Sequence, residues 1–169
     1  MGGAQYVHTF DKCFFMPSDL TAGLEYNRDR LKDNMWGYNR HTDQTVNIYS
    51  AFLQNEWKND RWGILIGGRL DKHNMVDNVI FSPRANLRFN PTQNINLRLS
   101  YSSGFRAPQA FDEDMHIENV GGTVAMIERT KNLKEEKSQS FSASADIYHR
   151  FGAFQTNFLI EGFYTKLTD

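Results

Sequence analysis

The sequence predicts an all-β fold, an antiparallel up-and-down meander of about eight strands of the kind that crosses a membrane as a β-barrel. Three observations predict it. Apolar and polar residues alternate along most of the chain, short turns alternate with long polar connections, and aromatic residues are frequent (14%) although the mean hydropathy is −0.60. Lipid-facing apolar residues that alternate with polar lumen residues produce such averages. No apolar run approaches the roughly 18 residues of a transmembrane helix.

The alternation has a period of two, which places successive side chains on opposite faces of a strand. In segment 95–102, for example, leucines at 97 and 99 alternate with Asn96, Arg98 and Ser100. Segment 45–57 is less regular, and segment 5–15 depends mainly on its β-favouring composition. Strands are expected at 5–15, 20–27, 45–57, 62–71, 81–89, 95–102, 141–147 and 154–166.

The connections alternate in length. Short turns rich in turn-forming residues are expected at 16–19, 58–60, 90–93 and 150–153, and long polar loops at about 29–44, 72–79 and 103–137. Short turns on one side and long loops on the other are typical of outer-membrane barrels. Aromatic pairs such as Trp57 and Trp62, or Phe151 and Phe154, flank the short turns. Such rings favour the boundary between lipid and water.

The alternate positions of each strand form two sets of residues, one mainly apolar (the apolar parity) and one mainly polar (the polar parity), and each set predicts one face of the sheet. The apolar parity is expected to face lipid. Its members include Ile64, Ile66, Leu87, Leu97, Leu99, Phe158 and Ile160. The polar parity is expected to line a lumen, through Arg69, Asp71, Arg84, Arg88, Arg98 and Glu161, together with Glu25, Glu56 and Asp146. In a soluble sheet the same charges would form a solvated face. No Ser–His–Asp order, zinc-protease helix motif or phosphate-binding glycine loop is present, so no enzyme is expected.

The totals exclude other classes. The 19 basic and 20 acidic residues nearly balance, which argues against a nucleic-acid partner. The single Cys13 cannot form an internal disulfide and is expected to be a small structural residue. No basic region followed by an apolar stretch opens the chain, so an exported protein would carry its signal outside this sequence.

Four segments occur in an order that resembles a known family. Segment 101–108 (YSSGFRAP) resembles a Y-x-x-G-F-R-A-P stretch, and 132–138 (NLKEEKS) resembles N-L-K-P-E-x-S with Glu135 in place of the proline. Segment 67–71 (GGRLD) resembles a G-x-R-x-D strand end, and 53–57 (LQNEW) fits the strand before it. Together they resemble the C-terminal half of the TonB-dependent outer-membrane receptors, over about residues 45–166.

The resemblance implies that residues 1–169 are part of a receptor β-barrel domain, a segment of a larger transmembrane barrel of about 22 strands, without the N-terminal plug. It implies an active transporter of the cell outer membrane that imports a large, scarce nutrient: an iron complex, cobalamin or a glycan. The implied partners are outer-membrane lipid, that nutrient, and the TonB system acting through the plug region. No cofactor is implied.

The ligand candidates lie at the rim and in the long loop. Gly104 would permit a bend, Pro108 would end the strand, and Arg106 would lie at the rim, where it could contact ligand or pair with an acidic group. The loop adds Asp112, Glu113, Asp114 and His116. No zinc or calcium spacing occurs among them, so a solvated acidic loop is the simpler interpretation and the metal question stays open.

Two alternatives remain. A small closed barrel of eight strands could hold a small apolar ligand, although the many lumen charges oppose an apolar pocket. An outer-membrane barrel enzyme would need a Ser–His pair near the membrane. His149 lies on the apolar parity, and no serine elbow accompanies it.

Overall fold

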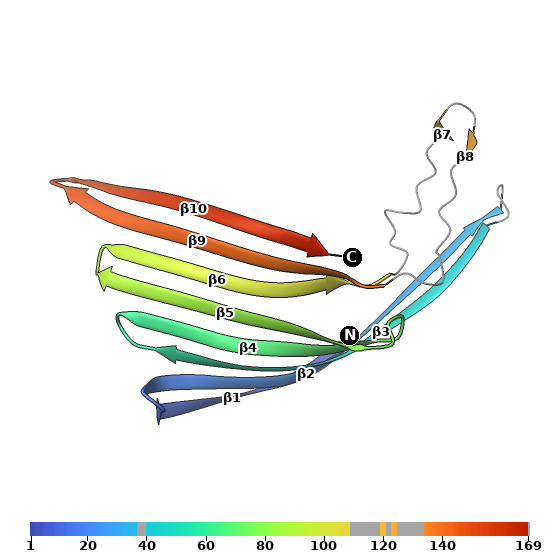
Figure 1. The fold of residues 1–169 in the computed structure, drawn as a ribbon, viewed down its shortest axis with the longest axis horizontal. Coiled ribbons are helices and arrows are strands. Elements are labelled where there is room, and N and C mark those ends of the chain that lie inside the picture. The colour runs from blue at the N-terminus through green and yellow to red at the C-terminus, as the bar shows by residue number, and fades with distance from the viewer. Residues whose placement is uncertain (37–39, 109–118, 121–122, 125–133, 169) are drawn as a thin grey trace.

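The computed structural model describes residues 1–36, 40–108, 119–120, 123–124 and 134–168. Eight long strands form one antiparallel sheet in chain order (Figure 1). They are β1 (Gly2–Cys13), β2 (Met16–Met35), β3 (Arg40–Lys58), β4 (Trp62–His73), β5 (Val79–Thr92), β6 (Ile95–Arg106), β9 (Glu136–Phe151) and β10 (Phe154–Thr168). Two short strands, β7 (Asn119–Val120) and β8 (Thr123–Val124), pair with each other. The predicted meander is confirmed.

The tight turns gather at one end of the sheet and the longer connections at the other (Figure 1). At the β3–β4 turn, Asn59 Oδ1 accepts hydrogen bonds from the backbone N–H groups of Arg61 (2.9 Å) and Trp62 (2.7 Å). The β9–β10 turn begins with Gly152 at a φ of 58°, a conformation that glycine adopts without strain. The predicted turns at 58–60 and 150–153 are therefore confirmed to within one or two residues, whereas the turn expected at 90–93 lies at 93–94, because β5 continues to Thr92.

The first turn differs from the prediction. The chain reverses at Phe14 and Phe15, and Met16 already belongs to β2, so the turn expected at 16–19 is wrong. Phe14 has a φ of 63°, and the N–H of Phe15 donates to the carbonyl of Cys13 at 2.9 Å. This is a tight γ-turn, a strained form that composition does not reveal. Pro17 occupies the start of a strand, one of the few strand positions open to proline.

The loop expected at 29–44 is also wrong, because β2 and β3 continue through most of it as a two-stranded hairpin. The hairpin projects beyond the rest of the sheet (Figure 1). Arg30 and Asp43 hold it together with two hydrogen bonds of 3.1 and 2.6 Å. Both of its faces carry polar residues, so the hydrophobic alternation that marks the other strands is missing here.

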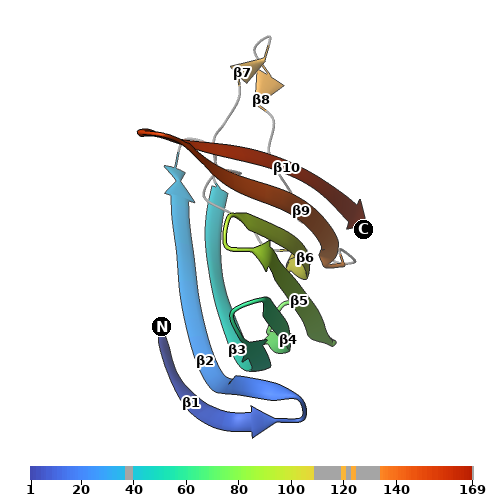
Figure 2. The same ribbon diagram turned by 90° about the vertical axis from the view of Figure 1, so that its left-hand side faces the viewer.

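The sheet has almost no interior. Among the described residues, only four apolar side chains are buried: Val46, Val76, Ile80 and Ala107. The sheet forms a single curved layer (Figure 2) in which β1 and β10 are the outermost strands. The alternative of a closed eight-stranded barrel is therefore wrong. No helix in the described part of the chain is long and apolar enough to cross a membrane.

Gly67 packs closely against the backbone and Cβ atoms of the neighbouring strand β3. A Cβ atom there would lie 2.6 Å from the Cβ of Gln54 and 3.0 Å from the carbonyl oxygen of Leu53. We expect Gly67→Ala to lower the free energy of unfolding by roughly 1–3 kcal/mol, because strand backbone must move to admit the methyl group. Denaturant unfolding of the whole protein in detergent measures this. Gly162→Ala is the control, since its Cβ would meet nothing within 4 Å. Equal losses in both variants would mean that crowding at Gly67 is not the cause.

Candidate functional site

The strand register separates the side chains into an apolar and a polar face. Ile64 of β4 lies opposite Leu87 of β5, which lies opposite Leu99 of β6. The same row continues to Ala143 and Gly162. All seven residues predicted to face lipid share this apolar face, and Ile66, Leu99 and Phe158 are each more than half exposed (56, 54 and 61%). In water such a surface would have to be covered.

Aromatic side chains form two bands across the apolar face. Near the tight turns, Phe15 stacks on Trp57 with ring centroids 5.8 Å apart, and Trp62 stacks on Phe89 at 4.2 Å. The indole N–H of Trp57 donates to the carbonyl of Cys13 at 3.0 Å. Indole rings with one apolar side and one hydrogen-bonded N–H suit a boundary between lipid and water.

The second band lies toward the loops. Tyr26 stacks on Tyr49 at 4.9 Å, and Tyr101 packs on Phe141 at 4.8 Å, with Tyr164 next in the row. On β3, β9 and β10, which carry an aromatic residue in each band, the bands are separated by eight to ten residues, as between Phe154 and Tyr164. At about 3.4 Å per residue and a tilt of about 40°, this separation is about 20–25 Å, close to the apolar band of an outer-membrane barrel.

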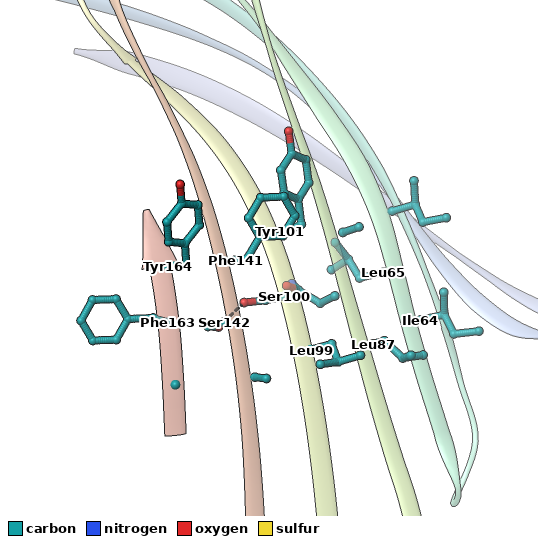
Figure 3. Close-up of a pocket in the computed structure, with 15 residues that line it drawn as sticks. Ile64, Leu65, Leu87, Leu99, Ser100, Tyr101, Phe141, Ser142, Phe163 and Tyr164 are labelled. Carbon is teal, nitrogen blue, oxygen red and sulfur yellow. Dashed lines mark hydrogen bonds between the residues drawn. The ribbon is translucent and has the colours of Figure 1, made fainter. Parts of the chain in front are cut away.

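Between the bands lies a shallow apolar hollow of about 710 Å³ (Figure 3). Tyr101, Phe141 and Tyr164 form one wall, and Leu99 and Leu87 lie in the next row. The hollow exists because small residues, Ala85, Ala143 and Gly162, occupy its floor. Its surface is almost entirely hydrocarbon, as contact with lipid chains requires.

The polar face carries a charge network centred on Arg69. Its guanidinium lies 2.6 Å from Glu25 Oε2 and 2.8 Å from Asp71 Oδ1, and it donates to Ser50 Oγ at 2.8 Å. The Ser50 hydroxyl in turn donates to Asp71 Oδ1. The network joins three strands, β2, β3 and β4. The side chain of Asp71 is only 4% exposed, so its charge depends on these partners.

All nine residues predicted to line a lumen lie on this polar face. Arg84 lies opposite Gly67, Arg88 lies opposite Arg98, and Glu161 lies opposite Ser144. Two hollows follow the face, one of about 550 Å³ that includes Arg69 and Arg84, and one of about 500 Å³ that includes Arg88, Arg98 and Glu161. A second ion pair, Lys58 with Asp19 at 2.6 Å, lies near the tight turns.

The rim residues lie where the long loop leaves and rejoins the sheet. Arg106 is the exposed last residue of β6 and lies opposite Glu136, the first residue of β9. The strand passes Gly104 in regular register with β9. Glu135 pairs with Lys137 at 3.3 Å, and a hydrogen bond from its own backbone, followed by Lys137, holds the pKa of its carboxyl below the usual value. Asp112, Glu113, Asp114 and His116 lie outside the described residues.

A small buried cluster at the rim was missed by the sequence prediction. Val76, Ile80 and Ala107 pack together, with Phe105 against them. Beside them in β4, His73 is 1% exposed, and its Nδ1 accepts a hydrogen bond from the N–H of Met75 at 3.0 Å. The single sequence signal for this cluster is that a few apolar residues occur within and beside otherwise polar loops. In the described ranges, no three His, Cys, Asp or Glu side chains form a group that could hold a metal ion.

The comparisons with known proteins agree with this geometry. The family model described as TonB dependent receptor-like, beta-barrel, matches residues 3–169. No curated protein matches the chain by sequence. The siderophore receptor PirA of Pseudomonas aeruginosa has a similar structure (TM-score 0.75, 16% identity), over 98% of this chain and 31% of that one. PirA of Acinetobacter baumannii gives a TM-score of 0.64 at 16% identity, over 98% and 33%.

A mutant of the ferric enterobactin receptor PfeA of Pseudomonas aeruginosa, in complex with enterobactin, gives a TM-score of 0.66 at 18% identity. That match covers 87% of this chain and 24% of the receptor. The chain thus spans about a third or less of the length of the structures it resembles. The match of the family model over nearly every residue shows that this chain belongs to the TonB-dependent receptors and forms part of their β-barrel.

Proposed function

We propose that this chain is part of the wall of an outer-membrane receptor that imports an iron–siderophore complex by TonB-dependent active transport. In this proposal the apolar face contacts lipid and the polar face lines the lumen. The observation that carries it is the single-layer sheet whose exposed apolar face is edged by two aromatic bands. Such a surface is stable only where hydrocarbon covers it.

The descriptions of the similar structures favour one of the three nutrient classes expected from the sequence. Those reported above are described as siderophore receptors or as a ferric enterobactin receptor. We therefore favour an iron–siderophore complex over cobalamin or a glycan. The plug and its contact with TonB belong to the rest of the receptor, and their presence is part of the proposal.

The full-length receptor tests this function. In cells that lack other siderophore receptors, its expression should restore growth on a ferric siderophore as the sole iron source, and removal of TonB should abolish that growth. Radiolabelled iron uptake measures the transport directly. Growth on cobalamin or a glycan, with no iron uptake from any siderophore tested, would contradict the proposed nutrient class.

The long loop has a separate test. Deleting 109–118 removes the predicted ligand residues Asp112, Glu113, Asp114 and His116 and no long strand. We expect iron uptake to fall because the deletion removes charged residues that could contact the ligand, and a few such residues often carry most of the binding energy. The amount of folded receptor in the outer membrane should stay unchanged, because every long strand remains. Deletion of residues 36–39, which connect β2 to β3 in the sequence, controls for shortening another connection. Normal uptake by the receptor that lacks 109–118 would exclude this loop as a capture site.

A further inference from the structure

Two arginines face each other on the polar face. Arg88 of β5 and Arg98 of β6 are direct partners in the register. Like charges at such positions repel across the strand pair. Neither forms an ion pair with another described residue. Arg88 Nη2 donates to the carbonyl of Asn59 at 3.2 Å, and Arg98 Nε donates to Asn96 Oδ1 at 2.8 Å. Both acceptors are neutral.

These two hydrogen bonds orient the guanidinium groups and leave most of their donors unused. A guanidinium has five N–H donors, and each of these arginines uses one of them in the bonds described. Both arginines line the same hollow of about 500 Å³. Gly63 lies opposite Arg88 and leaves room for the arginine side chain, because a Cβ on Gly63 would lie 3.1 Å from Arg88 Nε.

Hydroxyl groups complete the hollow. Ser144 lies opposite Arg98, and Ser100 and Ser142 share a hydrogen bond in the next row of the sheet. A hydroxyl can rotate its proton toward an acceptor. The hollow thus combines two guanidinium groups with hydroxyls from β6 and β9.

We infer that Arg88 and Arg98 form a binding site for one oxyanion group, a carboxylate or a phosphate, held between their guanidinium groups. Arginine binds both groups through pairs of parallel hydrogen bonds, which are stronger than neutral ones. An anion at this position converts the repulsion between the arginines into two attractions. The inference concerns this part of the wall alone and holds whatever nutrient the receptor carries.

Carboxylates in the same hollow limit how much negative charge a bound ligand can carry. Glu56 and Glu161 also line it, and neither pairs with Arg88 or Arg98 in the described structure. Their negative charge disfavours a large polyanion. The site therefore suits a single oxyanion group. Its source is either a free solute or ligand, or a carboxylate from another part of the receptor.

The test uses the full-length receptor in detergent, with inorganic phosphate as the probe and sodium chloride of equal ionic strength as the reference. The thermal midpoint, followed as phosphate is added, gives the affinity. We expect phosphate to raise the midpoint of the unmodified receptor. Arg88→Gln and Arg98→Gln should each weaken phosphate binding about tenfold or more, because each removes a charge-assisted pair of hydrogen bonds. Arg98→Lys keeps the charge without the planar donors and should bind with intermediate affinity.

Two variants sharpen the result. Arg150→Gln removes a charge on the same sheet outside the hollow, where Arg150 Nε donates to the carbonyl of Gly152, and should leave phosphate binding unchanged. Glu161→Gln removes the competing carboxylate and should strengthen phosphate binding. If a carboxylate of the receptor itself fills the site, phosphate will have no effect, yet Arg88→Gln and Arg98→Gln will lower the midpoint and Arg150→Gln will not. Arginine variants that match Arg150→Gln in both stability and phosphate response would overturn the inference.

Discussion

Leu99→Arg in the full-length receptor should lower the free energy of folding into lipid bilayers by roughly 2–4 kcal/mol, the cost of an arginine near the bilayer midplane of a barrel. Leu99 is 54% exposed on the apolar face, where it lies between Leu87 and Ala143 in a row made of aliphatic and small residues. A charge there has no water and no partner of opposite sign. Reversible denaturant unfolding of the receptor in vesicles measures the loss.

The matched control is Asn86→Arg. Asn86 lies opposite Ser100, the residue after Leu99, and belongs to the polar face. An arginine there would enter the hollow that contains Glu56, so we expect a change of less than about 1 kcal/mol. If both variants lost the same stability, or if Asn86→Arg lost more, the assignment of the apolar face to lipid would be reversed.

Arg69→Gln should lower the free energy of unfolding by roughly 2–3 kcal/mol. The change leaves Asp71, whose side chain is 4% exposed, with a hydroxyl as its only remaining partner among the contacts described above. Breaking a fully buried ion pair costs about 3–5 kcal/mol. The smaller figure is expected because the Arg69 side chain is 38% exposed, so water reaches one side of the network.

A double variant separates charge from packing. Arg69→Gln combined with Asp71→Asn removes both charges and should recover part of the loss, since no carboxylate is left unpaired. Arg150→Gln, an exposed arginine near the β9–β10 turn, gives the background cost of losing a surface charge. Denaturant midpoints of the four proteins suffice. If Arg69→Gln cost no more than Arg150→Gln, the network would not contribute to stability.

The sequence predicts the two faces well because parity is a local property. Once Leu97 and Arg98 are neighbours in a strand, they must point to opposite sides, whatever the strand pairs with. The rim cluster could not be predicted in this way. His73 is buried because a turn and the base of a distant loop fold against it, and neither contact leaves a periodic pattern.

Like the rim cluster, the pairing register between neighbouring strands cannot be predicted from the alternation of residues within one strand. Parity places Arg88 and Arg98 on one face, but only the turn between β5 and β6 decides that they stand opposite each other. That pairing includes an irregularity between Phe89 and Thr92, which shifts the alignment of the strands. A one-residue slip would have paired each arginine differently. The sequence therefore predicted the charged face without predicting the oxyanion site.

The projecting β2–β3 hairpin has a consequence for how the molecule loosens. Beyond Ile48, β3 has no ladder partner other than β2, and an isolated two-stranded ribbon is only marginally stable in water. Asn74 stabilises the base of this hairpin. Its side chain donates to the carbonyl of Thr45 at 2.8 Å and accepts from the N–H of Asn47 at 2.9 Å. The projecting part of the hairpin is thus a local unfolding unit, able to open and close while the eight-stranded part of the sheet stays folded.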